Sequence, residues 1–277
     1  MAYWQLARPR IVGMVLFSML VAGLTATRPA GSWPLLLHGV LGSALVIVGA
    51  VALNQRLERR SDAVMPRTAS RPLPSGRLTQ GQVSWFAALT SLSGLLYLGL
   101  MVNRTTLLLA AVSWLLYVWI YTPMKAISVW QTPIGAVAGA MPTLLGGAAV
   151  GVPTDPTVLV LFGILFFWQF PHSMAIAWLY RGEFADARVR VATVVDPSGQ
   201  LAAWLSVVGA AALVPVTLVP LLYGSSGWGY AIPAVAAGAV YLAASIAFLR
   251  RIEDRWARTL LRVSLVYLVV VLGALMC

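Results

Sequence analysis

The sequence has few charged side chains for its length. Charged residues make up only 10% of the 277 positions, whereas hydrophobic residues make up 60%. A soluble domain of this size needs far more polar side chains to cover its surface. This balance excludes a water-soluble globular protein and indicates that a lipid bilayer surrounds most of the chain.

Cysteine and lysine are almost absent. Cys277 is the only cysteine, and Lys125 is the only lysine among basic residues that are otherwise arginines. One cysteine cannot form an intramolecular disulfide or build a cysteine-based metal site. No internal repeat or low-complexity tract is visible in the sequence. These absences exclude a disulfide-stabilised scaffold and a cysteine-ligated metal centre.

The formal net charge of +11 does not come from a basic domain. The arginines are scattered between long apolar runs and do not gather on one polar segment. We therefore expect no nucleic-acid partner, and we interpret the basic residues as a signal of membrane topology.

Apolar runs near bilayer-spanning length recur along the whole chain. They predict nine membrane-spanning helices, at 11–27, 34–53, 83–102, 105–121, 132–152, 157–179, 201–223, 230–249 and 257–276. The first run follows Arg8 and Arg10 and also fits a cleaved signal peptide, but eight further spans follow, so we expect it to be retained. Most connections are short, which predicts an all-α membrane protein whose helices form one bundle, with residues 1–277 as a single domain.

The basic residues also predict the orientation of the chain. If the N-terminus is cytoplasmic, every basic residue except Arg28 and Arg104 falls on the cytoplasmic side. Every acidic residue except Asp155 falls there too, mainly in the two longest polar segments, 54–82 and 180–200. Acids and bases together on one membrane face indicate a polar site at that face.

Three polar side chains follow one another at intervals of four residues at the end of the second predicted span: Asn54, Glu58 and Asp62. Each interval turns a helix by only about 40°, so the three share one face. Their oxygens suit Mg²⁺, which usually binds through one or two carboxylates together with substrate phosphates. The spacing equally fits a solvated helix end whose acids pair with Arg59 and Arg60.

Basic side chains follow at the same membrane face. Arg67, Arg71 and Arg77 lie in a proline-stiffened loop, and their guanidinium groups suit either diphosphate oxygens or anionic lipid headgroups. Tyr121 and Lys125 end the fourth span, where the lone lysine suits a phosphate as a point charge. Interfacial anchoring is the alternative for these two residues.

A second polar group follows the sixth span. Glu183 and Asp186 are three residues apart, so they share a helix face and offer a second pair of metal ligands. His172 lies about a turn and a half inside the span, where a polar ring needs a partner. It either contacts a haem iron, transfers a proton, or joins two helices by a hydrogen bond. His38 is expected only to pack at the outer interface.

Taken together, four motifs resemble the intramembrane aromatic prenyltransferase superfamily, which includes para-hydroxybenzoate polyprenyltransferase. They are Ala52-Leu-Asn-Gln, the Arg-Thr-x-x-Arg-Pro-Leu-Pro-Ser-Gly stretch from Arg67, Tyr121-Thr-Pro-x-Lys125, and Trp168-Gln-Phe-Pro-His172 with the segment 175–180. The last motif separates haem O synthases from their quinone and chlorophyll relatives. The resemblance begins at Leu6 and covers essentially the whole chain.

The resemblance implies nine transmembrane helices around a central cavity, with two acidic motifs and Mg²⁺ at its cytoplasmic mouth. It implies catalysis and metal binding by Asn54, Glu58, Asp62, Glu183 and Asp186, diphosphate binding by Arg67, Arg71, Tyr121, Lys125 and Arg181, and haem binding by His172. The implied reaction transfers a farnesyl group from farnesyl diphosphate to a vinyl group of haem B. The resemblance also implies a location in a bacterial-type inner membrane. Membrane lipid and haem-handling membrane enzymes would be its partners there.

The chain departs from the superfamily pattern at several positions. Glu58 and Glu183 replace the usual aspartates, Phe184 replaces a tyrosine, and Arg188-Val-Arg-Val-Ala-Thr replaces small residues and Met-Leu-Pro. A prenyltransferase for a quinone precursor or chlorophyllide therefore stays an alternative, as does a transporter or non-catalytic haem carrier. The gathering of charges at one mouth and the lack of a repeat count against transport.

Overall fold

The computed structural model describes residues 1–27, 29–222 and 227–276, and every regular element within these ranges is a helix. The long helices are α2 (Pro9–Thr25), α3 (Trp33–Leu57), α6 (Gln80–Met101), α7 (Arg104–Leu115), α9 (Gln131–Ala149), α10 (Pro156–Leu179), α13 (Gln200–Leu222), α14 (Trp228–Arg250) and α15 (Asp254–Leu275). The short ones are α1 (Ala2–Ala7), α4 (Arg59–Val64), α5 (Pro66–Ala69), the π-helix η1 (Leu116–Tyr121), α8 (Thr122–Met124), α11 (Arg181–Asp186) and α12 (Ala192–Val195). The predicted all-α class is confirmed.

Each of the nine predicted spans coincides with a helix, but their lengths differ. In the described part of the chain, seven helices are long and apolar enough to cross a bilayer, and α7, η1 and α8 together form one of them. The other two predicted spans fall on α2, which has 17 residues, and α9, which has 19. A multi-pass membrane protein is confirmed, whereas the count of nine spans and the cytoplasmic N-terminus stay predictions.

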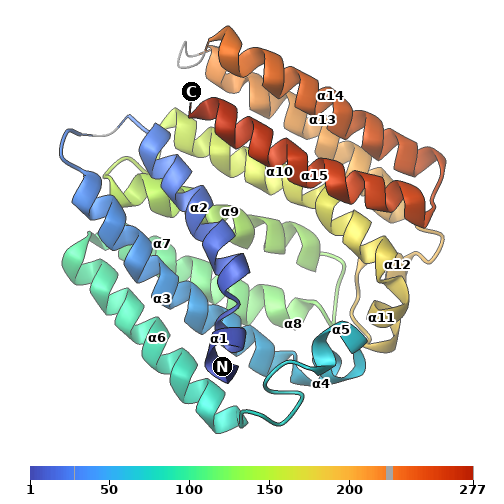
Figure 1. Ribbon diagram of the computed structural model, residues 1–277, viewed down its shortest axis with the longest axis horizontal. Coiled ribbons are helices and arrows are strands. Elements are labelled where there is room, and N and C mark those ends of the chain that lie inside the picture. Colours follow the sequence, from blue (N-terminus) through green and yellow to red (C-terminus); the bar gives the residue numbers. More distant parts are fainter. Residues whose placement is uncertain (28, 223–226, 277) are drawn as a thin grey trace.

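The long helices form two groups that lie side by side (Figure 1). One core is built by α2, α3, α6, α7 and α9 around Met19, Leu36 and Leu98. The other is built by α10, α13, α14 and α15 around Tyr241 and Tyr267. Because α9 packs along α10, the two groups meet at this pair of helices.

Glycines let α3 pack tightly against α6, and α9 against α2. A Cβ atom at Gly49 would collide with the Ser91 hydroxyl, and one at Gly146 would collide with the Met19 carbonyl. Lipid tails give little hydrophobic drive for helices to associate, so close backbone approach does much of this work in a membrane. These contacts fix the positions of α3 and α9.

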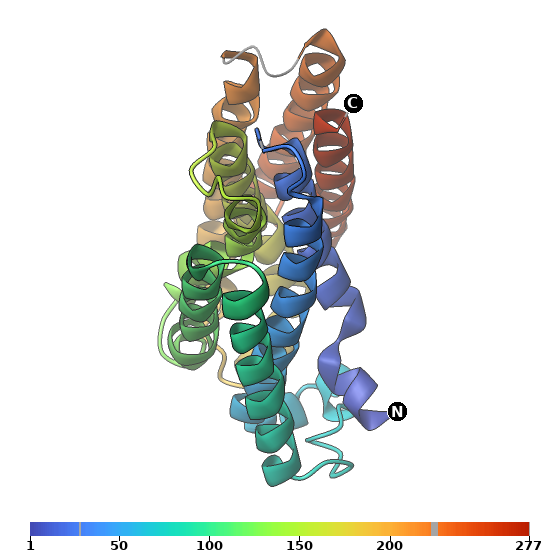
Figure 2. The same ribbon diagram turned by 90° about the vertical axis from the view of Figure 1, so that its left-hand side faces the viewer.

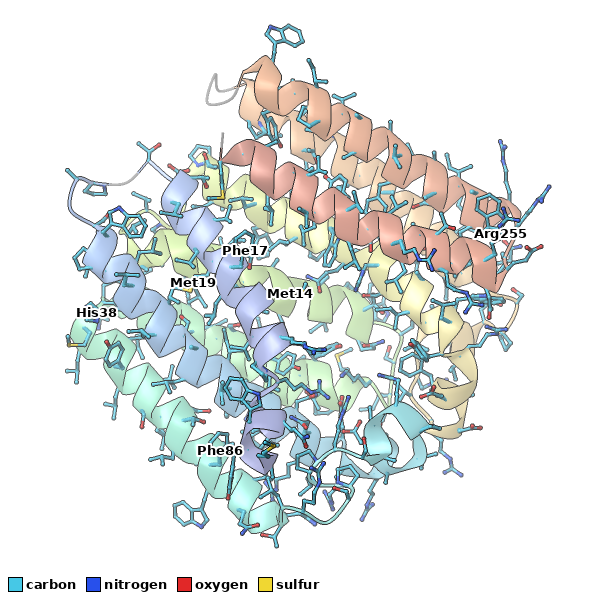
Figure 3. All side chains as sticks on the ribbon, viewed as in Figure 1. Met14, Phe17, Met19, His38, Phe86 and Arg255 are labelled. Atoms are coloured by element: carbon cyan, nitrogen blue, oxygen red, sulfur yellow. The ribbon has the colours of Figure 1, made fainter. Side chains whose placement is uncertain are left out.

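The short helices α1, α4, α5 and α11 lie at the same end of the bundle (Figures 1 and 2). Arg77 Nη1 donates to Gln5 Oε1 at 2.7 Å, which joins the α5–α6 loop to α1. The opposite end carries His38, whose Nδ1 lies 2.6 Å from the Tyr97 hydroxyl, and Figure 3 shows it far from Arg255 on α15. Polar connections thus gather at one end of the molecule.

Candidate active site

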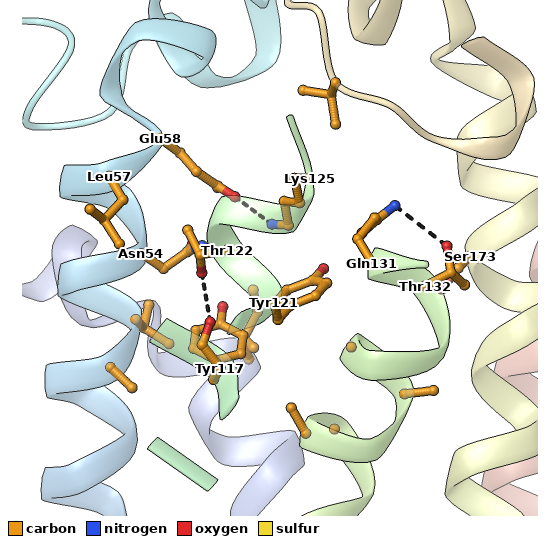
Figure 4. A pocket seen from close by; sticks show the side chains of 18 of the residues that line it. Asn54, Leu57, Glu58, Tyr117, Tyr121, Thr122, Lys125, Gln131, Thr132 and Ser173 are labelled. Carbon is orange, nitrogen blue, oxygen red and sulfur yellow. Dashed lines mark hydrogen bonds and ion pairs between the residues drawn. The ribbon is translucent and has the colours of Figure 1, made fainter. Parts of the chain in front are cut away.

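A cavity of about 720 Å³ lies between α2, α3, α9 and α10 at this polar end. Side chains deep in the helices, such as Val15, Val46 and Leu145, give it an apolar interior. Residues of α4, α5 and α11, and of the segments that follow α5 and α11, form its rim, which carries charged side chains (Figure 4). The arrangement can hold a long apolar group with an anionic end near the rim.

Asn54, Glu58 and Asp62 all line the cavity. Helix α3 ends at Leu57, yet the Glu58 amide still donates to the Asn54 carbonyl at 2.9 Å, and the Asp62 amide donates to the Glu58 carbonyl at 2.8 Å. The spacing of four residues therefore survives the break between α3 and α4. Asn54 Nδ2 also donates to Thr122 Oγ1 at 3.0 Å, and Asn54 and Asp62 are each only 1% exposed.

Two of the predicted diphosphate ligands form ion pairs with these carboxylates. Arg71 Nη1 lies 2.5 Å from Asp62 Oδ2, and Lys125 Nζ lies 2.5 Å from Glu58 Oε1 and 4.5 Å from the ring centroid of Tyr121. Burial raises the pKa of Asp62, although Arg71 opposes that shift. Burial disfavours the charge of Lys125, but the Glu58 carboxylate together with Tyr121 and Tyr117 raises the pKa of the amine. The protonated amine is therefore the favoured form.

Arg67 connects the first polar segment to the second. Its Nε lies 3.3 Å from Glu183 Oε2, and its guanidinium carbon lies 5.1 Å and 5.2 Å from the ring centroids of Tyr180 and Phe184. Phe184, which stands where the superfamily usually has tyrosine, lines the cavity. Neither acidic residue of the second motif lines the cavity: Asp186 is exposed, and Glu183 reaches the rim only through its ion pair with Arg67.

Arg181, a predicted diphosphate ligand, is not among the residues that line the cavity. Its Nη1 lies 3.0 Å from Asp254 Oδ1, and its guanidinium stacks over Trp178 at 4.2 Å from the ring centroid. The Trp178 indole nitrogen donates to the same carboxylate oxygen at 3.1 Å. The physical reason for the difference is Asp254, which competes for Arg181 from the start of α15.

His172 also points away from the cavity. Its Nδ1 lies 2.8 Å from Ser264 Oγ on α15, and its ring stacks on Trp168 with the centroids 4.6 Å apart. On the same helix Gln169 and Ser173 line the cavity, so the face of α10 that carries His172 is a different one. The structure thus gives His172 the helix-to-helix hydrogen bond that was the alternative to haem contact.

Several polar residues of the cavity wall were not found from the sequence: Tyr117, Thr122, Gln131, Gln169 and Ser173. Thr122 Oγ1 donates to the Tyr117 carbonyl at 2.7 Å, and Figure 4 shows both beside Asn54. Tyr117 lies in the π-helix η1, an element that often marks functional sites. The spacing of Gln169 and Ser173 by four residues in an apolar span was the available signal, because such residues share a face.

Two glycines on α9 make room for the side chains of the wall. A Cβ atom at Gly135 would lie 2.5 Å from the ring of Tyr121, and one at Gly139 would lie 2.5 Å from Gln169 Nε2. The two positions are four residues apart and so share the face of α9 that lines the cavity. The missing side chains let Tyr121 lie under Lys125.

The oxygens of Asn54, Glu58 and Asp62 fit a magnesium ion that binds together with a diphosphate. In residues 1–27, 29–222 and 227–276, no group of three or more His, Cys, Asp or Glu side chains could hold a metal ion. Mg²⁺ rarely needs such a cage, because substrate phosphates and water complete its six ligands. The donor set at the rim matches this mode of binding.

A helical membrane bundle with an apolar cavity and a rim of this kind is the architecture of an intramembrane prenyltransferase. The UbiA prenyltransferase family matches residues 15–269, so the chain belongs to that family and is a prenyltransferase. It is 38% identical to the protoheme IX farnesyltransferase of Solibacter usitatus, over 99% of this chain and 97% of that one.

Solved structures show the same fold. A structure of digeranylgeranylglyceryl phosphate synthase in membranes has a TM-score of 0.80 and 18% identity, covering 99% of this chain and 96% of that one. A UbiA homolog from Archaeoglobus fulgidus bound to DMAPP and Mg²⁺ has a TM-score of 0.70 and 14% identity, covering 99% of both chains. A metal ion and a prenyl diphosphate therefore occur together in this fold.

Proposed function

We propose that the chain transfers a farnesyl group from farnesyl diphosphate to a vinyl group of haem B. The observation that carries the proposal is the cavity, whose apolar interior adjoins a rim of ion pairs. The relative from Solibacter usitatus is named for the same prenyl group and acceptor. The C1–O bond of farnesyl diphosphate breaks, the terminal vinyl carbon bonds to C1, and water supplies a hydroxyl to the neighbouring carbon and loses a proton.

The basic residues of the rim hold the diphosphate as negative charge develops on it. Arg67, Arg71 and Lys125 each leave a carboxylate and turn to the phosphate oxygens. Fixed positive groups aimed at a developing charge are usually the largest single contribution to catalysis. Asn54, Glu58 and Asp62, with Glu183 across the rim, would hold Mg²⁺, which supplies further positive charge to the leaving group.

The interior of the cavity protects the reactive prenyl cation. Val46, Ala50 and Leu145 exclude water from the bond that breaks. Tyr117 and Tyr121, whose ring centroids are 5.5 Å apart, offer aromatic faces that attract a cation. Water must reach the product only after the vinyl carbon has attacked, so a dry interior favours transfer over hydrolysis.

The surroundings of the enzyme form part of the same proposal. We place it in a bacterial-type inner membrane as a single domain with a cytoplasmic N-terminus, where both greasy substrates reach the cavity from lipid. Haem-handling membrane enzymes are partners that fit a haem product. Iron contact by His172 would require its ring to leave Ser264, so haem recognition is not assigned to this residue.

The test is turnover by purified protein in lipid nanodiscs supplied with haem B, farnesyl diphosphate and Mg²⁺. Mass spectrometry should detect haem carrying one added farnesyl group and one added hydroxyl group, and chelation of Mg²⁺ should abolish the product. Parallel reactions offer para-hydroxybenzoate or chlorophyllide as acceptor. Prenylation of one of these acceptors, with haem B left unchanged, would refute the proposed acceptor and keep the reaction class.

A further inference from the structure

Five basic side chains line the cavity, and two of them have no acidic partner. Arg67, Arg71 and Lys125 each form a salt bridge, whereas Arg8 and Arg188 form none with any residue that the structure describes. The Nη2 atom of Arg8 is buried, and no described residue accepts a hydrogen bond from it. Burying a guanidinium without a partner is unfavourable, so Arg8 favours an anion beside it. Arg188 is exposed and extends to the cavity from its rim.

The same two arginines have an unusual backbone. In the described ranges they are the only residues other than glycine with positive φ, 47° at Arg8 and 54° at Arg188. Arg188 follows α11 in a Schellman motif, because its amide donates to the Ala185 carbonyl at 3.0 Å and the Val189 amide donates to the Phe184 carbonyl at 2.9 Å. Glycine is the residue that this position favours, since a Cβ atom is strained there.

Arg8 has the same left-handed conformation at the end of α1. The chain just before it is fixed, because Leu6 is fully buried and its carbonyl accepts a hydrogen bond from Gln55 Nε2 at 2.7 Å. Burial and the positive charge of Arg71 both lower the pKa of Arg8. The fold thus holds a cation where backbone preference, burial and a like charge all oppose it, a combination typical of ligand-binding positions.

We propose that Arg8 and Arg188 bind anionic oxygen groups of a ligand inside the cavity, in addition to the ion-paired residues of the rim. Guanidinium groups bind phosphate and carboxylate oxygens alike, so the group is either a phosphate of the prenyl diphosphate or a propionate of the porphyrin. The identity of these two ligands rests on the proposed function. Arg188 belongs to the segment 188–193, in which this chain departs from the superfamily pattern.

Glycine substitutions separate binding from folding. Arg8→Gly and Arg188→Gly relieve the strained backbone and remove the guanidinium, so both variants should unfold at a temperature no lower than the wild type. Each should weaken ligand binding by about tenfold or more, as expected for a lost charge-assisted hydrogen bond. Arg10→Gln is the matched control. It removes the same charge, but Arg10 is exposed and lies outside the cavity lining.

Two binding measurements identify the group that is bound. Calorimetry reports the affinity for inorganic diphosphate with Mg²⁺, and absorbance reports the affinity for haem B and for its dimethyl ester. Loss confined to diphosphate identifies the leaving group as the ligand. If the variants bind haem B more weakly than the wild type but bind its dimethyl ester equally well, the propionates are the ligand.

The failures of the two proposals differ. Wild-type protein that binds both probes, alongside glycine variants that bind them equally well, would overturn the role of Arg8 and Arg188 alone. Wild-type protein that binds neither probe would overturn the proposed function and this inference with it. If Arg10→Gln weakened ligand binding as much as the glycine variants do, the effect would come from net charge alone, and the proposed role of Arg8 and Arg188 would be wrong.

Discussion

Asp62 is the most buried carboxylate of the rim, and Arg71 is its ion-pair partner. Asp62→Ala should lower turnover by about two to three orders of magnitude, the usual cost of losing one electrostatic contact at a transition state. Glu183→Ala should cost less, because Glu183 reaches the site only through Arg67. Farnesyl transfer measured against Mg²⁺ concentration, with thermal unfolding as a check, compares them.

Asp186→Ala is the matched control for this series, because Asp186 is exposed and outside the cavity. It should change turnover by less than about twofold, as surface substitutions away from a site usually do. If Asp186→Ala and Asp62→Ala were equally damaging, the second acidic motif would hold metal in a geometry that the structure does not have.

Binding of Mg²⁺ should depend on pH through Asp62. Burial raises the pKa of this carboxyl, and a metal needs the ionised form, so protons compete with Mg²⁺ up to a higher pH than at an ordinary aspartate. The affinity, measured by calorimetry with diphosphate present, should rise with pH and level off above the raised pKa. Asp62→Asn should remove this component, and an unchanged slope in that variant would assign the dependence to another group.

Some site residues could be predicted from the sequence and others could not. Asn54, Glu58 and Asp62 were found because a spacing of four residues fixes their shared face on any helix. That spacing does not fix how the helix is rotated about its axis. Asp186 therefore shares a face with Glu183 in the sequence but faces solvent in the fold.

Long-range competition was equally hidden from the sequence. Arg181 is bound by Asp254, which lies 73 residues away, and His172 by Ser264, which lies 92 residues away. Local sequence patterns do not predict partners that are this far apart in the chain. The cations without partners, Arg8 and Arg188, were not found for the same reason, since pairing is known only once the helices are packed.

At the scale of elements, hydropathy located every long helix, but it could not reveal the π-helix η1. One π-turn adds a residue to the helical turn and changes the direction of all side chains that follow it. Tyr117 and Tyr121 both lie in this stretch, and both line the cavity. The place of Tyr121 was predicted from its motif, whereas Tyr117 needed the structure.

The contact between α9 and η1 should control diphosphate binding. Gly135→Ala places a methyl group against the ring of Tyr121, which must shift from its position under Lys125. A displaced ring costs about 0.5–1.5 kcal/mol, so KM for farnesyl diphosphate should rise about threefold to tenfold while kcat changes less. Gly273→Ala on α15 is the control, because nothing lies within 4 Å of its Cβ position. A similar KM in both variants would contradict the link.

The hydrogen bond between His172 and Ser264 should join α10 to α15. In a double-mutant cycle of His172→Ala and Ser264→Ala, the coupling in the free energy of unfolding should be about 0.5–1 kcal/mol, as for other hydrogen bonds within membranes. The absorbance of bound haem B should be the same in wild type and both variants. A haem spectrum altered by His172→Ala alone would restore iron contact as its role.

At the scale of the whole molecule, orientation in the membrane can be tested directly. Single cysteines at Ser75 and Ser198, in a background with Cys277→Ser, should be shielded from impermeant thiol reagents added outside intact cells. The basic residues near both loops favour the cytoplasmic side. Thr154→Cys, in the exposed loop between α9 and α10, should react. Labelling of either polar loop from outside would reverse the topology.

The ion pairs at the rim have a consequence for how the two ligands arrive. A metal ion alone would push Lys125 and Arg71 off Glu58 and Asp62 into an apolar cavity without an anion to receive them. Diphosphate alone would find Lys125 and Arg71 occupied and only the unpaired Arg8 and Arg188 able to receive it. Only their joint arrival lets every charge change partner at once, so each ligand must raise the affinity for the other by the same factor. The two ion pairs thereby resist free magnesium and free phosphate alike, and only the metal complex of the donor substrate separates them.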